Sequence, residues 1–565
     1  MAARRSLVVL IVLLVALGLG LLLVRVLGPG GWTLPKLIML AAFVGTAPWT
    51  GLCFANAVIG FVLLLRQPKD AGNAHLGQAP LPTVAIVTTV RDEDMRRVLP
   101  SLRHLLHDLD AGGARGTFAL FILSDTAGAE TAASEQRAVA AFREEDRDPG
   151  RIHYRRRPAN TGFKAGNVMD FLDHHSDGFE LMLTLDADSR MSAETVLRLV
   201  RTIQADPSLA IVQHLTVGLP ASSAFPRLFQ FGMRAGMRTW ATGQAWWQGD
   251  EGPYWGHNAV VRIAPFRAHC RLPLLPDGSH ILSHDQVEAA LLAGAGWGVR
   301  VLADEDGSCE ANPPALPEFL RRELRWVAGN LQYRHLLRMP GLRPMGRWQL
   351  MQAILLFAGA PLYLLFLLAA AVAAATDHTS PFPGSAATAL ALAWAGALYA
   401  PKLLGYAEVA LSPEKRARYG GLARFAVGVV MEFAFTLLLD AVSTVAKTGA
   451  MLRLSRAGWT PQNREDRGVG WGEATRLLWP QTALGVAVFS GFAVAGWATV
   501  LWAAPLAGGL LLAIPLCVLT AQPHAGRWLR TLQIAAIPEE FSRRAARPVA
   551  TSVPALVLQP RHEPD

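Results

Sequence analysis

The sequence predicts an integral membrane α-helical bundle with an inserted cytosolic α/β domain. Its 565 residues are 52% hydrophobic and 17% charged, with a mean hydropathy of +0.27, whereas about a quarter of the residues in a soluble protein are charged. The long apolar segments lie towards the two ends of the chain. Residues 71–345 lack such a segment and alternate short β-rich runs with helical stretches, which is typical of a mostly parallel sheet covered on both faces.

Residues 1–70 predict a transmembrane hairpin with both ends in the cytoplasm. Apolar spans over about 7–26 and 37–65 are each long enough to cross a bilayer. Basic residues precede the first span and follow the second, namely Arg4, Arg5, Arg66 and Lys69. A secretory signal peptide is the alternative interpretation of the first span. The length of its apolar core and the absence of a small-residue cleavage site argue against that alternative.

Residues 71–345 predict the cytosolic α/β domain. Its clearest β-rich runs are TVAIVTTV, FALFIL and ELMLTL, at 83–90, 118–123 and 180–185, and a helix follows the third from near Ser192. Ligands of such sheets bind beyond the carboxyl ends of the strands. The polar residues after each run are therefore the candidates for a functional site.

Residues 346–522 predict a second membrane bundle, followed by a basic cytosolic tail over 523–565. Confident spans cover about 349–376, 385–404, 482–503 and 505–521. The segment 422–454 is apolar but interrupted by Glu432, Asp440 and Lys447, so we expect a span with a return, or helices at the membrane interface. A cytosolic loop is predicted over 455–478.

Acidic residues follow each of the three β-rich runs. Glu93 follows the first, Asp125 the second, and Asp186 and Asp188 the third. Each alone is better explained by a helix cap or a turn. Together they should meet at one edge of the sheet, where a divalent cation would offset their repulsion, and oxygen ligands suit Mg²⁺ or Mn²⁺.

Three further motifs carry candidate chemistry. Lys164, in the glycine-rich NTGFKAGN, would open a helix near bound phosphates, although a solvated basic turn is the alternative. Asp285 stands where a strand-to-helix turn is expected, and is a general base or an N-cap. Arg325 and Trp326 offer groups for phosphates and sugar faces, or pack against the membrane.

The net charge and the cysteines exclude other classes of protein. The net charge of +9 arises largely from residues that flank apolar spans, which argues against a nucleic-acid partner. The four cysteines form no C-x-x-C pair, so neither a zinc site nor a disulfide framework is expected.

These motifs, in this order, resemble the family-2 processive glycosyltransferases, which have a GT-A (nucleotide-diphospho-sugar transferase) fold. The segments NTGFKAGN, LDADS, YWGHNAVVR, ILSHDQVEAAL and RWVAGN more closely resemble the glucans biosynthesis glucosyltransferases, the inner-membrane synthases of osmoregulated periplasmic glucans. The resemblance is strongest over 81–337. The PEEF sequence near Pro538 and the flanking spans match more loosely.

The resemblance implies a site for UDP-glucose and a growing β-glucan. Asp125 would bind the uridine end with Glu93 nearby, while Asp186 and Asp188 would hold the diphosphate through Mg²⁺ or Mn²⁺. Asp188 is the expected direct ligand. Asp285 would deprotonate the acceptor hydroxyl in an inverting transfer.

The resemblance also assigns residues around the acceptor. Arg325 and Trp326 would line the acceptor and diphosphate region, and His257 and Asn258 would contact sugar. Arg322 stands where the family's Q-x-x-R-W motif usually has glutamine, which favours the periplasmic-glucan subgroup over cellulose synthases.

The implied setting is a multi-pass protein of the bacterial inner membrane with a cytosolic catalytic domain. The spans would thread the polymer outward, so the bilayer and a periplasmic glucan-handling protein are the expected partners. Trp459, Thr460 and Pro461 are faintly similar to a gating loop of cellulose synthases, and a structural connector is the favoured alternative. Other open interpretations are a synthase of cellulose or hyaluronan, a polyprenyl-phosphate glycosyltransferase, and an inactive glycan transporter.

Overall fold

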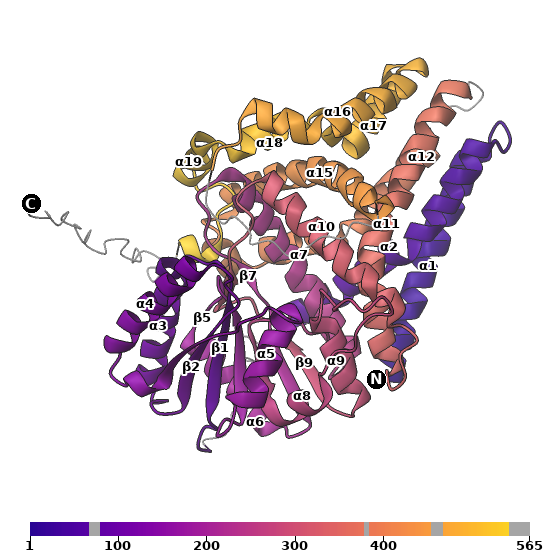
Figure 1. The fold of residues 1–565 in the computed structure, drawn as a ribbon. Helices are drawn as coiled ribbons and strands as arrows, with labels where there is room; N and C mark the ends of the chain where they lie inside the picture. Colours follow the sequence, from indigo (N-terminus) through magenta and orange to yellow (C-terminus); the bar gives the residue numbers. More distant parts are fainter. Residues whose placement is uncertain (67–78, 378–383, 454–466, 542–565) are drawn as a thin grey trace, which may run out of the picture.

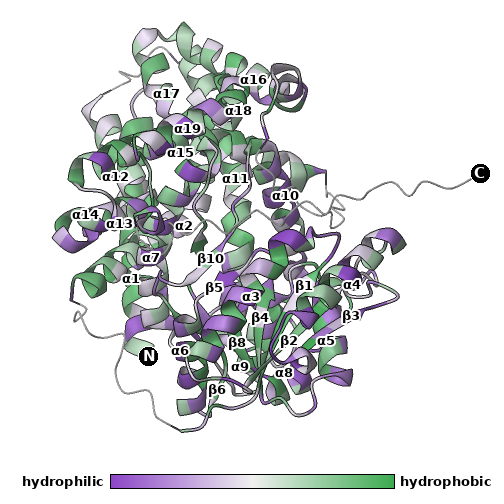
Figure 2. Cartoon of the chain, turned by 90° about the vertical axis from the view of Figure 1, so that its left-hand side faces the viewer, coloured by the Kyte–Doolittle hydropathy of each residue, from purple (hydrophilic) through white to green (hydrophobic). Residues whose placement is uncertain are grey.

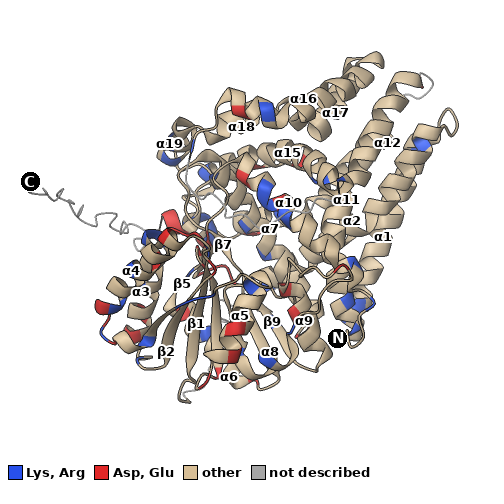
Figure 3. Ribbon diagram, in the orientation of Figure 1, with Lys and Arg blue, Asp and Glu red and all other residues tan. Residues whose placement is uncertain are grey.

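A computed structural model describes residues 1–66, 79–377, 384–453 and 467–541 (Figure 1). The α/β elements gather on one side of the molecule and the long apolar helices on the other, as two views at right angles show (Figures 1 and 2). Lys and Arg, Asp and Glu concentrate in the α/β domain and where it meets the helices, and they are sparse on α12, α16 and α17 (Figure 3).

A seven-stranded sheet forms the centre of the α/β domain. Its order is β3-β2-β1-β4-β8-β6-β9, and only β8 runs antiparallel to its neighbours, so the predicted mostly parallel sheet is present. The strands are β1 (Val84–Val90), β2 (Phe118–Ser124), β3 (Ile152–Arg156), β4 (Leu181–Asp186), β6 (Leu209–His214), β8 (Ala259–Arg262) and β9 (Gly298–Leu302). A small sheet beside it contains β5 (Arg190–Met191), β10 (Ser308–Glu310) and β7 (Val217–Gly218).

Helices cover both faces of the large sheet because successive strand residues point to opposite sides. In β1, Val84 and Ile86 join one apolar core, while Ala85 and Val87 join the other. The first core packs against α3 (Met95–Ala111), α4 (Ala129–Glu144) and α6 (Ala193–Ala205). The second packs against α5 (Phe163–His174), α8 (Ile263–His269) and α9 (Asp285–Gly294).

Two helices join the α/β domain to the apolar helices. Helix α7 (Ala224–Gln248) packs against α2, α13 and α15, and α10 (Leu316–Gln332) packs against α11 and α15. An ion pair of 2.7 Å between Glu323 on α10 and Lys447 on α15 adds to the second junction. The remaining elements are the helices α13 (Ala400–Leu411), α14 (Pro413–Arg418) and α19 (Pro523–Thr531) and the 3₁₀ turns η1 (Pro149–Arg151), η2 (Tyr333–His335) and η3 (Pro538–Glu540).

Within the described parts of the chain, five helices are long and apolar enough to cross a membrane. They are α1 (Ala2–Leu27), α2 (Leu34–Arg66), α11 (Pro344–Thr376), α15 (Leu422–Leu452) and α16 (Trp471–Val494). The count rises to seven if two bent pairs are each one span. One pair joins α12 (Ser385–Leu398) to α13 at 73°, and the other joins α17 (Trp497–Leu511) to α18 (Ala513–Ala521) at 60°.

The structure corrects three of the expected spans. Residues 422–452 form one helix, so the predicted span with a return within that segment is wrong. The expected break between 503 and 505 is also wrong, because Pro505 lies inside α17 and the chain instead turns at Gly496, where φ is +108°. The Trp459–Pro461 loop and residues 542–565 of the tail lie outside the described residues.

The polar residues of α15 are paired within the apolar bundle. Glu432 is fully buried and accepts hydrogen bonds from Lys402 Nζ, at 2.5 Å, and from the Tyr406 hydroxyl. Asp440 accepts a hydrogen bond of 2.9 Å from the Tyr399 hydroxyl. A charge in such surroundings is costly unless it is paired, and these contacts account for both carboxylates.

The segment around η3 fastens the end of the described chain to α7. Arg227, which is fully buried, donates to Glu540 Oε2 at 2.6 Å, and Arg234 donates to Glu539 Oε2 at 2.5 Å. Arg234 also donates to Glu305 Oε2 at 3.1 Å, in the loop before β10. We call η3 and these two arginines the C-terminal clasp. It connects three parts of the chain that are distant in sequence.

Candidate active site

The carboxyl ends of β2, β1 and β4 lie side by side, as the sequence predicts. In the register of the sheet, Val90 pairs with Ser124 and Thr89 pairs with Asp186. The loops that carry Glu93, Asp125 and the Asp186–Asp188 pair therefore leave the sheet at one edge.

Asp125 is buried and held by a guanidinium. Arg157, which follows β3, donates to both oxygens of this carboxylate at 2.8 Å each. The same guanidinium donates to the carbonyl oxygens of Thr161, at 3.0 Å, and Phe163, at 3.1 Å. The Asp125–Arg157 pair thus fixes the NTGFKAGN segment against the sheet.

Lys164 connects the Asp186–Asp188 pair to a second loop. Its Nζ donates to the Asp186 carboxylate and, at 2.9 Å, to the carbonyl oxygen of Gly256 in the YWGHN segment. A tight turn follows β4, in which the Asp186 amide donates to Ser189 Oγ at 3.0 Å. The ammonium group of Lys164 therefore lies at the acidic edge, and Asp188 follows in the turn after β4.

The acidic residues after β1 differ in their surroundings. Asp94 is the N-cap of α3 and accepts a hydrogen bond of 3.1 Å from the Arg96 amide, so the capping alternative holds for this residue. Asp92 has a φ of +55°, and its amide donates to Thr126 Oγ1 at 2.7 Å. Glu93 lies half-buried between these two fixed residues.

Asp285 begins α9 and lies beside Lys164. His284 is the cap residue, so the N-cap alternative for Asp285 is wrong. A Cβ added at Gly256 would lie 3.3 Å from Asp285 Cβ and 3.8 Å from Lys164 Nζ, which places all three side by side. Burial raises the pKa of the Asp285 carboxyl above its ordinary value, with His284 opposing this effect and Glu288 adding to it.

Glu310 belongs to this site and was missed from the sequence. It ends β10, and its Oε2 lies 3.5 Å from His257 Nε2. Burial raises the pKa of Glu310, and so does the charge of Asp188. Burial alone would lower the pKa of His257, but Glu310 and Asp186 raise it above its usual value. The available signal was a carboxylate in the sequence SCEANPP, directly before a turn.

Asn258 is an internal support in this structure. Its side chain is fully buried, its Nδ2 donates to Ser308 Oγ at 2.9 Å, and its backbone amide donates to the Thr184 carbonyl at 2.7 Å. Its φ of +52° lies in the left-handed region, which asparagine tolerates better than most residues. Asn258 therefore has no exposed surface that could contact a sugar. Of the two predicted sugar contacts, His257 is the one that lies beside the acidic residues.

Helix α10 contributes the Arg-Trp motif. The Arg322 guanidinium lies 4.6 Å from the centroid of the Trp326 ring, and its charge acts on Glu310 and Asp188. Trp326 is 41% exposed, so its indole is accessible, and Arg325 beside it is half-buried. Arg322 therefore packs against the Trp326 ring, and Trp326 presents an accessible aromatic face.

The acidic edge is compatible with a divalent cation bound together with a diphosphate. Among the described residues, no group of three His, Cys, Asp or Glu side chains is arranged to hold an ion. Mg²⁺ in phosphate-transfer sites is usually held by one or two carboxylates plus the substrate phosphates. The pair of Asp186 and Asp188 matches that donor set.

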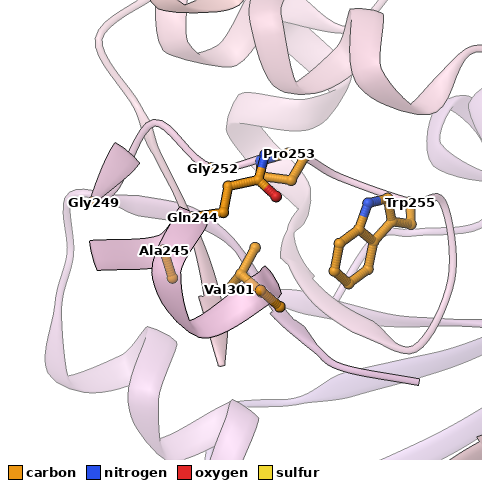
Figure 4. Close-up of a pocket in the computed structure, with 8 residues that line it drawn as sticks. Gln244, Ala245, Gly249, Gly252, Pro253, Trp255 and Val301 are labelled. Atoms are coloured by element: carbon orange, nitrogen blue, oxygen red, sulfur yellow. The ribbon is translucent and has the colours of Figure 1, made fainter. Parts of the chain in front are cut away.

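A small hollow lies beside the site, between the end of α7 and the YWGHN loop. It is too narrow to admit a water molecule, and Figure 4 shows the Trp255 indole on one side with Ala245 and Val301 opposite. The Trp255 amide donates to Gln213 Oε1 at 2.6 Å, and Gln244 Oε1 accepts from Trp240 Nε1 at 2.8 Å.

Comparisons with known proteins agree with one another. Residues 84–270 match the model of glycosyl transferase family 2, and residues 181–401 match glycosyl transferase family group 2. The chain is 32% identical to the glucans biosynthesis glucosyltransferase H of Xanthomonas campestris pv. campestris (strain B100), over 92% of this chain and 84% of the relative. It is 34% identical to that of Caulobacter vibrioides (strain NA1000 / CB15N), over 90% and 81%.

Two solved structures are similar at a lower level. A mannosyltransferase from Pyrobaculum calidifontis, in complex with GDP-Man and Mn²⁺, covers 66% of this chain and 98% of its own, with 16% identity and a TM-score of 0.43. Mannosyl-3-phosphoglycerate synthase from Rubrobacter xylanophilus covers 52% and 88%, with 16% identity and a TM-score of 0.30.

Proposed function

The chain belongs to the glucans biosynthesis glucosyltransferase family, within the family-2 glycosyltransferases, and from this premise we propose that it builds a β-glucan from UDP-glucose at the bacterial inner membrane. Its α/β domain is accordingly a GT-A glycosyltransferase domain. The observation that carries the proposal is the meeting of Lys164, the Asp186–Asp188 pair and Asp285 at one edge of the sheet.

The donor would bind along the acidic edge. We assign the uridine end to the loops of Glu93 and Asp125, and the diphosphate to Asp186 and Asp188 through Mg²⁺ or Mn²⁺. Lys164 adds a positive charge at the same place. When bound, the metal would offset the negative charge that develops on the departing UDP.

Asp285 would act as the general base. It accepts the proton of the acceptor hydroxyl while that oxygen attacks the anomeric carbon and the bond to UDP breaks, which inverts the configuration to a β-linkage. The raised pKa of Asp285 brings it closer to the working pH, where a general base is most effective.

The acceptor end of the glucan would lie against Trp326 and Arg325, with Trp255 as a second aromatic surface. Trp326 belongs to α10, which packs against the apolar helices α11 and α15, and Trp255 lies beside the end of α7. A growing chain that starts there reaches the bundle directly. We therefore propose processive synthesis with export across the membrane, to a periplasmic glucan-handling protein, and the product is an osmoregulated periplasmic glucan.

The test is glucose incorporation by membranes that contain the Asp285→Asn variant. We expect loss of glucan synthesis from radiolabelled UDP-glucose, by a factor of about 10² or more if a general base is removed, with UDP binding retained. Asp277→Asn is the matched control, because Asp277 is an exposed carboxylate eight positions earlier, bonded to Ser279.

Linkage analysis of the wild-type product identifies the polymer. A β-glucan that needs Mg²⁺ or Mn²⁺ supports the proposal. A single sugar extracted with lipid, or a product built only from another nucleotide sugar, contradicts it.

A further inference from the structure

His284 and Glu288 form a buried pair beside Asp285 that the proposed mechanism does not use. His284 Nδ1 lies 2.9 Å from Glu288 Oε2, one helical turn along α9. Their side chains are 13% and 3% exposed. A carboxylate so deeply buried needs a partner, and the histidine supplies it.

The pair lies at the centre of the site. A Cβ at Gly256 would be 3.6 Å from His284 Cε1, on the same side as Asp285 and Lys164. The backbone here is held from the far side, because the Tyr333 hydroxyl donates to the Ser283 carbonyl at 2.9 Å. Gly329 of α10 packs directly against Ser283. The backbone before His284 is therefore fixed by α10 and Tyr333, and the His284 ring lies close to Asp285.

Asp285 and Glu288 are two carboxylates three positions apart on one helix; Glu288 is buried and Asp285 is half-buried. Like charges at such a separation cannot both ionise without a nearby cation. Lys164 is one cation, but it is already bonded to Asp186 and Gly256. His284 is a second basic group whose charge acts on Asp285, and its effect is larger than that of Lys164.

We propose that His284, held by Glu288, is the counter-ion that keeps Asp285 charged and therefore able to accept a proton. This role rests on the proposed function, because it concerns the same base. His284 is a positioning residue and Glu288 fixes its ring. A neutral ring at this place would leave two carboxylates in competition for one proton.

The charges around the pair support this assignment. Burial alone would lower the pKa of His284, but Glu288 and then Asp285 raise it above its ordinary value. The other titratable groups that face Asp285 are Lys164, Tyr254 and Tyr333, and Cys270 faces Glu288. Both tyrosines and the cysteine have a raised pKa because they are buried, so they stay neutral and leave the histidine to balance the charge.

The experiment compares pH profiles of glucosyl transfer from UDP-glucose in membranes, for His284→Gln, Glu288→Gln and the double variant. In His284→Gln we expect the acid limb of kcat/KM to move to higher pH by about one unit. The KM for UDP-glucose should stay within about twofold, because the donor contacts are unchanged. His269→Gln, an exposed histidine of α8, is the control and should match wild type.

The double variant separates charge from packing. Removing Glu288 as well takes away the competing carboxylate, so the acid limb should return towards the wild-type position. In Glu288→Gln alone, the acid limb of the kcat/KM profile should stay in place or move to lower pH, because the competing carboxylate is gone. An unmoved limb in His284→Gln, no return in the double variant, or a shift to higher pH in Glu288→Gln overturns the proposal.

The same membranes distinguish this proposal from the proposed function. Wild type that incorporates no glucose contradicts the function, and the role of the pair with it. Wild type that incorporates glucose normally, beside an unmoved His284→Gln profile, overturns the pair alone. If His284→Gln fails to accumulate, the direction of the shift in Glu288→Gln decides.

Discussion

Asp125 has both carboxylate oxygens bonded to one guanidinium, and this limits how its substitutions can be interpreted. Only 7% of its side chain and 8% of the Arg157 side chain are exposed. Breaking a buried pair from one side leaves an uncompensated charge. A variant of Asp125 therefore changes the stability of the NTGFKAGN segment as well as any contact with uridine.

We predict that Arg157→Met destabilises the α/β domain by about 3–5 kcal/mol, because the Asp125 carboxylate stays buried without its partner. Thermal unfolding of the purified protein measures the effect. Arg96→Met is the control, since the Arg96–Asp94 pair is exposed and such pairs contribute at most about 1 kcal/mol. An unfolding midpoint of Arg157→Met equal to that of Arg96→Met would contradict the prediction.

The sequence was sufficient to predict the site residues that directly follow a strand of the sheet. Asp125 and Asp186 come directly after β-rich runs, and parallel strands deliver such residues to one edge. Glu310 and His284 were not predicted, because their significance depends on partners. Glu310 lies 53 positions from His257 in the chain, and no local pattern marks the contact.

Among the elements, the crossing of α2 and α7 depends on reciprocal glycines. A Cβ at Gly60 of α2 would collide with the carbonyl oxygen of Thr239, and a Cβ at Gly243 of α7 would collide with that of Asn56. Small residues let helix backbones approach this closely. Helix α7 leads into the loop that carries Gly256 and His257. The spacing of α2 and α7 therefore affects where this loop lies relative to the apolar helices.

We predict that Gly243→Ala lowers the free energy of unfolding by about 1–3 kcal/mol, since the obstructing atom is backbone and the helices must separate. The yield of folded protein and its thermal midpoint in detergent measure this loss. Gly18→Ala is the matched control, because nothing lies within 4 Å of a Cβ at Gly18 of α1. Equal midpoints for the two variants would show that the crossing tolerates a wider spacing.

Helix boundaries in the bundle were predicted less well than the existence of the helices. Apolar composition located each long segment, but the last two spans were divided near residue 504, next to Pro505 inside α17, and the turn at Gly496 was overlooked. Proline is tolerated inside an apolar helix when neighbouring groups satisfy the backbone. Similarly, Glu432 suggested an interruption, and its pairing with Lys402, 30 positions away, is what keeps α15 continuous.

At the scale of the whole molecule, the C-terminal clasp ties the chain end to the small sheet of the site. Arg234 bonds both Glu539 of η3 and Glu305, which precedes β10 and its Glu310. Arg227 bonds Glu540 and the carbonyl oxygen of Ile534. The position of Glu310 therefore depends on residues at the other end of the sequence.

We predict that a chain ending at Ile537 is less stable and more readily cut by trypsin near β10. It loses two hydrogen bonds to charged groups, each contributing about 1.5–3 kcal/mol. Limited proteolysis and glucose incorporation measure the effect. A chain ending at Phe541 keeps both carboxylates and serves as the control. Equal protease resistance in the two chains would show that the clasp is dispensable.

The clasp also has a consequence for the order of events during synthesis. Domains generally fold from the N-terminal end as the ribosome releases them, and every candidate catalytic residue, up to Trp326, emerges before the apolar helices after α10 exist. The carboxylates of η3 that bond Arg227 and Arg234 are synthesised more than 300 residues after these arginines. A nascent chain would thus contain every candidate site residue well before the carboxylates that bond Arg227 and Arg234 have been synthesised.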